Sequence, residues 1–399
     1  KERVKKMIKF GKWVVKFRIP ILILSFLLLI PTGIIYMNTR INYDILSYLP
    51  GDIETMKGQD ILLDEFGTGA FSVAVIDGMQ EKEISQLEDK LKEIDHVKDV
   101  LWYGALADIS IPMDMLPDDL KDSLQNADTG SQLMIITFDT SMSADETLDA
   151  IEEIRGLTNE QCLLSGMSAV VTDIKKICNS EVIMYVVIAA GLSALVLALT
   201  MDSFLLPFIF LLSIGMAIVY NLGTNFIAGE ISFVTQALAA VLQLAVTMDY
   251  SIFLWHSYLE NQERYPDDRK RAMSHAISQT LTSVVGSSIT TIAGFLAMCF
   301  MTFTLGMDLG VVMAKGVVFG VIGCVTILPS MILAMDKWIE KTRHKAIIPD
   351  LGRIGGFVTK HYWIFIILFL VIIGPAFYGQ NHNQVYYCLL YTSPSPRDG

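Results

Sequence analysis

The chain has 399 residues, of which 52% are hydrophobic and only 18% carry a charge. Such a composition is typical of a membrane protein and excludes a soluble domain of ordinary make-up. The formal net charge of −12 gives no support to nucleic-acid binding.

The two signs of charge occupy different parts of the sequence. Residues 1–18 contain eight Lys or Arg and one Glu, whereas residues 38–181 contain 29 of the 42 acids but 10 of the 30 Lys and Arg. We therefore expect a membrane protein with a basic flank on one side and an acidic domain on the other.

The first two segments predict a membrane anchor. Residues 1–18 form a basic cytoplasmic segment in this interpretation, and residues 19–37 form the first spanning helix. A cleaved signal peptide is the alternative, but the apolar run is long for one and no small-residue cleavage site follows it. The basic flank places the N-terminus in the cytoplasm by the positive-inside rule.

An extracytoplasmic α+β domain is predicted over residues 38–181. Alternating apolar residues indicate strands, and amphipathic periodicity indicates helices between them. The expected order is strand 71–76, helix 81–94, strand 97–103, strand 132–138, helix 144–157 and strand 161–164. This order fits a ferredoxin-like split βαβ unit of the porter type.

Residues 182–335 are predicted to form the membrane bundle, with spans at 182–200, 204–227, 231–255, 283–304 and 309–335. The loop 258–280 and the linker 336–361 are rich in Lys and Arg, which places both in the cytoplasm. Within that loop, residues 266–281 fit either an amphipathic helix on anionic headgroups or a solvated loop helix. Three glycines, Gly316, Gly320 and Gly323, predict close helix packing.

The sequence repeats itself near its end. Residues 9–16 read KFGKWVVK and residues 353–360 read RIGGFVTK, and each copy precedes an apolar span, the later one at 362–378. A second half is therefore expected to begin at about residue 350, inside the linker, and the chain is interpreted as truncated. Residues 388–399 lose the pattern and are interpreted as a non-native tail.

The sequence contains no motif that indicates an enzyme or a cofactor site. The five cysteines show no CxxC spacing and the six histidines no HxxxH, so neither a disulfide framework nor a metal site is expected. Nucleotide-binding loops and nucleophile elbows are missing from the sequence as well. We predict no enzymatic activity, no metal and no cofactor.

One acid stands inside an apolar span. Asp249 lies within residues 231–255, followed at once by Tyr250. A charge at that depth costs on the order of 3 kcal/mol, so such residues usually face a bundle interior and have a function. A carboxylic acid that two conformations solvate differently suits a proton relay, with Tyr250 to orient it. The alternative is that Asp249 only makes an interhelical hydrogen bond.

Polar side chains accompany this pair. Gln243 and Thr247 share a stripe of the same span with Gln236 and Tyr250, and Ser287, Thr290 and Thr291 follow in the next. These hydroxyls either hydrate the acid or only make close helix contacts. Lys315 is expected to lie roughly 18 Å from Asp249 along the membrane normal, too far to pair with it.

The arrangement of one span, an outer domain, five spans and a restart resembles half of an RND-superfamily transporter. The stretch AVTMDYSIFLW at residues 245–255 looks like the fourth-helix motif of the MMPL branch, and residues 287–295 (SSITTIAGF) are similar to its fifth helix. Leu328-Pro329 and Ser165-Gly166 also fit. Thr247 departs from the family's usual glycine, and the second acid of the family's relay has no counterpart within these residues.

The resemblance implies proton-driven export of a lipid or hydrophobic small molecule across a bacterial cytoplasmic membrane, with Asp249 and Tyr250 as the relay. Membrane lipids are expected partners, nucleic acid is not, and a homo-oligomer is left open. Two alternatives remain: a sterol-sensing or receptor-like module that binds lipid without pumping it, and a Sec-accessory-like translocation factor.

Overall fold

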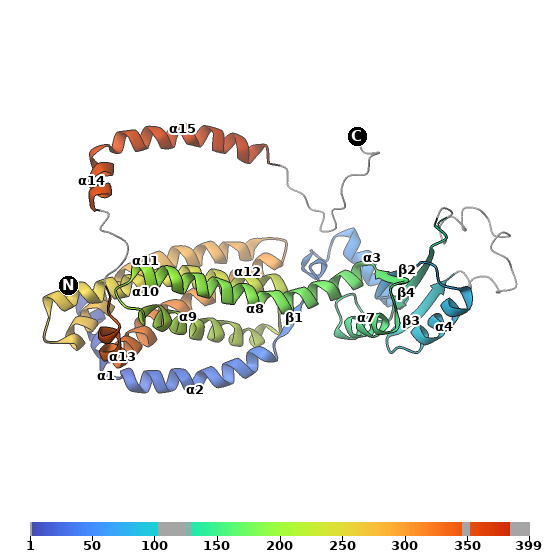
Figure 1. Cartoon of the computed structure of the whole chain (residues 1–399), viewed down its shortest axis with the longest axis horizontal. Coiled ribbons are helices and arrows are strands. Elements are labelled where there is room, and N and C mark those ends of the chain that lie inside the picture. Colours follow the sequence, from blue (N-terminus) through green and yellow to red (C-terminus); the bar gives the residue numbers. More distant parts are fainter. Residues whose placement is uncertain (1, 103–125, 127–128, 345–351, 384–399) are drawn as a thin grey trace. The chain divides into compact units, whose positions relative to one another are not determined.

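The computed structural model describes residues 2–102, 126, 129–344 and 352–383, without the side chains of residues 2–4, 228, 352 and 353. The chain divides into two compact units, Lys1–Lys345 and Ala346–Gly399. The predicted tail 388–399 lies outside the described residues. Figure 1 shows the elements in chain order.

Seven helices in the described part of the chain are long and apolar enough to cross a membrane. Each predicted span overlaps one of them, so the predicted class of a polytopic α-helical membrane protein is confirmed. The seven comprise α2 (Arg18–Met37), α8 (Met167–Thr200), α9 (Leu206–Gly223) with η3 (Thr224–Ala228), α10 (Phe233–Arg264), α11 (Arg269–Ala297) with η4 (Met298–Phe300), α12 (Leu305–Ile322) continuing to α13 (Leu328–Lys341), and α15 (Tyr362–Asn381).

The predicted loop 258–280 is wrong, because α10 and α11 continue through most of it. The first turns of α11 pack against α1 (Glu2–Lys16), where Gly11 lets the two backbones approach: a Cβ there would lie 2.4 Å from the Ser274 carbonyl oxygen. Ala272, Ala276 and Ile277 are fully buried. Neither a headgroup-bound helix nor a solvated one describes this segment, since its apolar face belongs to the core of the bundle.

A π-helical turn, η5 (Gly323–Ile327), interrupts the last helix of the bundle between α12 and α13. Pro329 follows it in the first turn of α13. Proline has no N–H to donate to the preceding turn, and a wider turn accommodates the missing bond. The predicted single span 309–335 is therefore one continuous helical segment whose pitch changes locally at η5.

The α/β region carries a four-stranded antiparallel sheet in the order β3-β4-β2-β5. Its elements are β2 (Ala70–Ile76), α4 (Glu81–Lys92), β3 (Val97–Trp102), β4 (Gln132–Phe138), α7 (Asp145–Leu157) and β5 (Cys162–Ser165). The order is that of a ferredoxin-like split βαβ unit, as predicted. The predicted end of the second strand at residue 103 lies outside the described residues.

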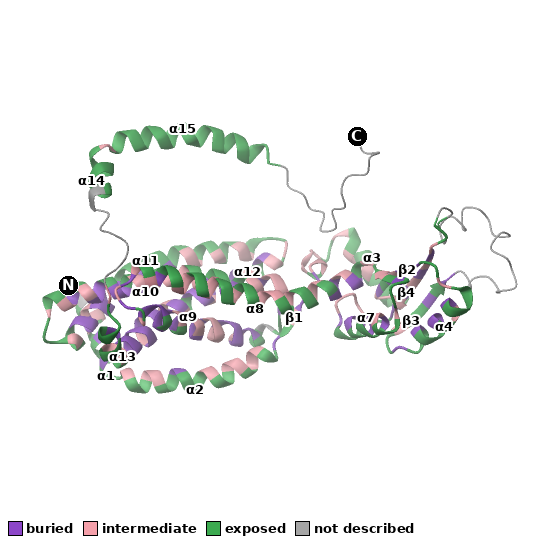
Figure 2. Ribbon diagram, viewed as in Figure 1, coloured by how far each residue is buried: buried purple, intermediate pink, exposed green. Residues whose placement is uncertain are grey.

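One face of this sheet forms the core of the region. Burial alternates along β4, and Met134, Ile136 and Phe138 are fully buried on the face that α4 and α7 cover (Figure 2). Alternation is the physical signature of a sheet packed on one side. The sequence analysis predicted neither α3 (Glu54–Asp64) nor the short parallel pair of β1 (Arg40–Asn42) with β6 (Glu230–Ser232).

The sequence repeat is also a repeat of local structure. In the first copy, α1 ends at Lys16 and α2 begins at Arg18. In the second, α14 (Gly352–Lys360) ends at Lys360 and α15 begins at Tyr362. Each copy is thus a short basic helix, a one-residue break and a long apolar helix.

Gly166 offers a test of how the sheet joins the membrane helices. It links β5 to α8 with φ of 105°, and a Cβ there would lie 3.0 Å from the Ser72 Cα. We expect Gly166→Ala to destabilise the α/β region by more than about 1 kcal/mol, because alanine rarely adopts this conformation. Limited proteolysis of the purified chain should show faster cleavage within residues 38–181.

The matched control is Gly156→Ala, at an exposed position of α7 with open space around it. Alanine favours helix there, so this variant should resist the protease at least as well as the wild type. Equal cleavage of both variants would contradict the assigned role of Gly166.

Candidate functional site

Helix α10 carries the predicted site residues and is fixed at its start by Ser232. The Ser232 side chain caps the helix by accepting a hydrogen bond from the Val234 N–H at 3.2 Å. Gln243, Thr247 and Tyr250 follow at three- and four-residue steps and are all buried. They share one face of α10, which turns toward the rest of the bundle.

An amide pair joins α10 to α9 in the core of the bundle. Asn221 Nδ2 donates to Gln243 Oε1 at 2.9 Å, and both residues are at most 1% exposed. A Cβ on Gly316 of α12 would lie 2.7 Å from Asn221 Nδ2, so only glycine leaves room for the pair. Asn221 Oδ1 and Gln243 Nε2 have no partner among the described residues. The interior of the bundle is therefore polar around Asn221 and Gln243.

Thr247 packs against a second glycine of α12, Gly320. Its hydroxyl donates to the Gln243 carbonyl oxygen at 2.6 Å, and its methyl carbon would lie 2.1 Å from a Cβ on Gly320. The predicted close packing at Gly316 and Gly320 is confirmed, and it serves the polar residues of α10. Gly323 makes only ordinary contacts.

Tyr250 meets α11 through a residue that the sequence analysis missed. Its hydroxyl oxygen accepts a hydrogen bond from Ser288 Oγ at 3.1 Å. The predicted residue next to it, Ser287, was expected to hydrate the acid or to make helix contacts. Ser288 continues the buried positions Ile277 and Val284 at helical spacing, and that periodicity was the signal that could have identified it.

Asp249 lies on the opposite, exposed face of α10, so the expectation that it faces the bundle interior is wrong for the described chain. One residue along a helix turns a side chain by about 100°, which takes Asp249 away from the partner of Tyr250. Leu242, Ala245 and Phe253 are exposed on the same face. No described residue forms a hydrogen bond or ion pair with the Asp249 carboxylate.

The other predicted residues lie on α11 and form no hydrogen bond with Asp249. Thr290 Oγ1 and Thr291 Oγ1 donate to the Ser287 carbonyl oxygen at 2.7 and 3.2 Å. Ser287 and Thr290 are exposed, and Thr291 is half-buried. They share α11 with other exposed small residues, among them Ser283, Gly286, Ala293 and Gly294. Lys315 donates to Asn225 Oδ1 rather than to Asp249.

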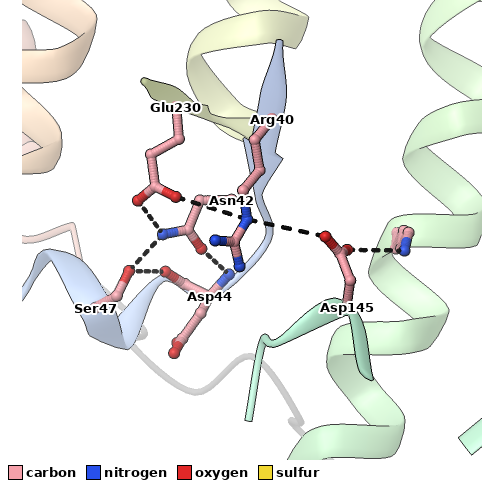
Figure 3. A network of polar contacts seen from close by, with 7 residues as sticks. Arg40, Asn42, Asp44, Ser47, Asp145 and Glu230 are labelled. Carbon is pink, nitrogen blue, oxygen red and sulfur yellow. Dashed lines mark hydrogen bonds and ion pairs between the residues drawn. The ribbon is translucent and has the colours of Figure 1, made fainter. Parts of the chain in front are cut away.

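A polar network ties the α/β region to the start of α10 (Figure 3). Strands β1 and β6 pair in parallel, which sets Arg40 beside Glu230. Arg40 Nε lies 3.9 Å from Glu230 Oε2 and 3.9 Å from Asp145 Oδ2 on α7, and Lys175 on α8 is 3.4 Å from Asp145. One arginine thus bridges the two parts.

Asn42 is the buried centre of this network. Its Nδ2 donates to Ser47 Oγ at 2.9 Å and to Glu230 Oε1 at 3.0 Å, and its Oδ1 accepts from the Asp44 N–H at 2.9 Å. Tyr48 lies nearby, and burial together with the Asp308 and Glu230 carboxylates raises the pKa of its hydroxyl.

Comparison with known proteins identifies relatives over most of the chain. The family model described as the MMPL family matches residues 67–361. SCO5905 of Streptomyces coelicolor, named as a membrane protein, is 25% identical over 295 residues, which cover 69% of this chain and 35% of that protein. MmpL12 of Mycobacterium tuberculosis, named as a probable transport protein, is 24% identical over 299 residues, covering 71% of this chain and 24% of that protein.

The chain spans about a third or less of the length of these two relatives, with 35% and 24% of them covered. Among solved structures, the translocon-associated membrane protein SecDF from Thermus thermophilus matches with a TM-score of 0.45 and 14% identity, over 81% of this chain and 38% of that one.

The polar network predicts an order of stability effects. Asn42→Ala should lower stability by about 1–3 kcal/mol, because it leaves the Asp44 N–H and the Glu230 carboxylate without their buried partner. Arg40→Ala should cost less than about 1 kcal/mol, because its ion pairs are long and its side chain is half-exposed. Thermal unfolding midpoints of the two purified variants test the order, and a larger loss for Arg40→Ala would contradict it.

Proposed function

Because the chain belongs to the MMPL family, we propose that it is part of a secondary active transporter. Protons pass through the Asp249–Tyr250 region of α10 and drive outward movement of a lipid or hydrophobic small molecule. The observation that carries this proposal is the carboxylate of Asp249, which has no partner among the described residues and is exposed between apolar neighbours on a membrane-spanning helix.

An unsolvated charge at the position of Asp249 costs free energy. It lies near the middle of α10 between Ala245 and Phe253, both exposed. An ionised side chain at membrane depth costs on the order of 3 kcal/mol unless something solvates it. In this proposal the carboxyl group binds and releases a proton as that face exchanges between lipid and water or a hydrogen-bond donor.

That exchange can do work across the membrane. Moving one elementary charge through the potential is worth about 2.3 kcal/mol per 100 mV. A proton that binds Asp249 from one side and leaves to the other biases the equilibrium between two conformations of the bundle by a comparable amount.

The buried partners give α10 a fixed rotation, which such a relay requires. Tyr250 is held by Ser288, and Gln243 by Asn221. In this proposal Tyr250 positions the backbone next to the acid, while Gln243 and Thr247 keep α10 seated on α9 and α12. Ser287, Thr290 and Thr291 lie along α11 and in this proposal stabilise helix contacts there.

We further propose that a second helical bundle covers the Asp249 face. Leu242, Ala245 and the small residues of α11 form a surface on which another helix can approach closely. The covering bundle comes either from a longer polypeptide or from a second copy of the chain. It supplies the donor or water that the acid lacks here.

The α/β region and the network at Arg40 complete the proposal. We propose that the N-terminus lies in the cytoplasm of a bacterial cell, which the basic residues of α1 favour, and that residues 38–181 lie outside its cytoplasmic membrane. The substrate then leaves through the outer α/β region. Strand β6 leads directly into α10, so a shift of α10 is transmitted to Glu230, Arg40 and α7.

Replacing the acid tests the relay. We expect Asp249→Asn to abolish proton flux, because the asparagine side chain does not ionise in the physiological range and so cannot carry a proton. The measurement uses the chain in liposomes that contain a pH-sensitive dye, with proton entry driven by a potassium diffusion potential. Flux through the variant should fall to that of protein-free liposomes.

Glu260→Gln is the matched control, an exposed acid of the same helix beyond the predicted span. It should retain the wild-type flux. Undiminished flux in Asp249→Asn, or wild-type flux no greater than in protein-free liposomes, would contradict proton transport by this chain.

Coverage of the Asp249 face has its own test. We expect Ala245→Cys to react more slowly with a lipid-soluble maleimide than Val187→Cys on α8, because only the first site is covered in the proposed assembly. Both positions are exposed in the described chain. Equal labelling rates in native membranes would show an uncovered face and would remove the second bundle from the proposal.

A further inference from the structure

An apolar groove of about 420 Å³ lies between α2, α9 and the π-helical turn η5. It runs along α2 from Ile21 to Thr32, a distance of about 16 Å at 1.5 Å per residue. Trp13 of α1 lines one end, and Thr224 lies among the lining residues beyond α9. All three walls belong to helices that are long and apolar enough to span a membrane.

The hydroxyl groups that line the groove are already engaged. Ser25 Oγ donates to the Ile21 carbonyl oxygen at 2.7 Å, and Thr32 Oγ1 to that of Leu28 at 2.7 Å. Thr224 and Thr326 likewise donate to carbonyl oxygens of their own helices. A bound water needs two to four polar partners, so the groove favours an apolar occupant.

Specific contacts rather than loose packing define the width of the groove. The Tyr220 hydroxyl donates to the Ser25 carbonyl oxygen at 2.5 Å and joins α9 to α2. At the other end α2 crosses α9 tightly, since a Cβ on Gly223 would lie 2.3 Å from the Thr32 carbonyl oxygen. Opposite α2, the π-helical turn begins at Gly323, which brings no side chain to the wall.

The charge at the Trp13 end indicates the headgroup of the occupant. Lys12 and Lys16 are exposed there, and Arg18 begins α2. Residues 1–18 as a whole contain eight Lys or Arg and one Glu. Basic residues next to a spanning helix attract anionic lipid headgroups. The apolar channel and the basic end together match the two parts of an anionic phospholipid.

We propose that this groove binds one acyl chain of an anionic membrane phospholipid, with the headgroup at the basic end of α1 and α2. The bound lipid is a structural partner that fills the space between α2 and η5. The proposal depends on the membrane insertion of these helices and is independent of proton transport through Asp249.

Photolabelling of the whole chain tests the site directly. The purified chain is placed in phosphatidylcholine nanodiscs with a trace of phosphatidylglycerol whose acyl chain carries a diazirine, and labelled peptides are located by mass spectrometry. Labels are expected on residues 24–32 and 319–327, above the level on the exposed face of α8. A phosphatidylcholine probe with the same chain should label the groove about five-fold less for each basic residue that contacts the headgroup.

Two variants separate the groove from the general lipid surface. Thr326→Trp fills the groove and should abolish its labelling by the phosphatidylglycerol probe. Val318→Trp, at an exposed position of α12 outside the groove, should leave that labelling unchanged. Lys16→Gln combined with Arg18→Gln should reduce labelling by the phosphatidylglycerol probe to that of the phosphatidylcholine probe.

Three outcomes would overturn the proposal. The first is groove labelling no stronger than on α8, and the second is equal labelling by the two probes; both use the wild-type chain and do not depend on how a variant folds. The third is a disulfide between Leu24→Cys and a cysteine on α15, such as Ile366→Cys, which would show that a helix of the protein occupies the groove. Transport measurements on Asp249→Asn bear on none of these.

Discussion

The structure depends on the need to pair polar side chains that are buried inside a bilayer, because an unpaired one costs free energy. Helix α10 shows how the chain meets this need. Gln243, Thr247 and Tyr250 reach Asn221, the α10 backbone and Ser288, respectively, and the glycines of α12 make the space in which two of them fit. These contacts bind α9, α10, α11 and α12 into one bundle.

The same contacts decide where Asp249 lies. Three residues of α10 are locked at three- and four-residue steps, so the helix cannot rotate without breaking buried hydrogen bonds or driving side chains into Gly316 and Gly320. Losing one such bond while its partner stays buried costs about 1–3 kcal/mol. Asp249 is therefore held outward, and whatever solvates it must approach that face. A relay at this position is a property of an interface rather than of one bundle.

Sequence patterns predicted the features that follow from moving apolar side chains out of water. They failed where a contact with one particular neighbouring residue determines the structure. Alternation placed β4 at residues 132–138, and apolar runs located every span, because both reflect transfer out of water. The packing of α1 against α11 depends on the close approach of Gly11 to Ser274, and a hydropathy profile does not detect such a contact. Ser288, which bonds Tyr250, is one residue beyond the predicted Ser287, and on a helix that is a different face.

The link between the bundle and the α/β region follows from chain connectivity. Strand β6 ends at Ser232, which caps α10, and β1 follows α2 after only two residues. Their pairing therefore couples the C-terminal end of α2 to the N-terminal end of α10, and Arg40 extends that coupling to Asp145 on α7. A displacement of α10 along its axis must either carry this joint with it or break the hydrogen bonds of Asn42. In this network Asn42 is buried and Arg40 is exposed. The hydrogen-bonded part around Asn42 therefore moves with α10, and the exposed ion pairs of Arg40 rearrange at little cost in free energy.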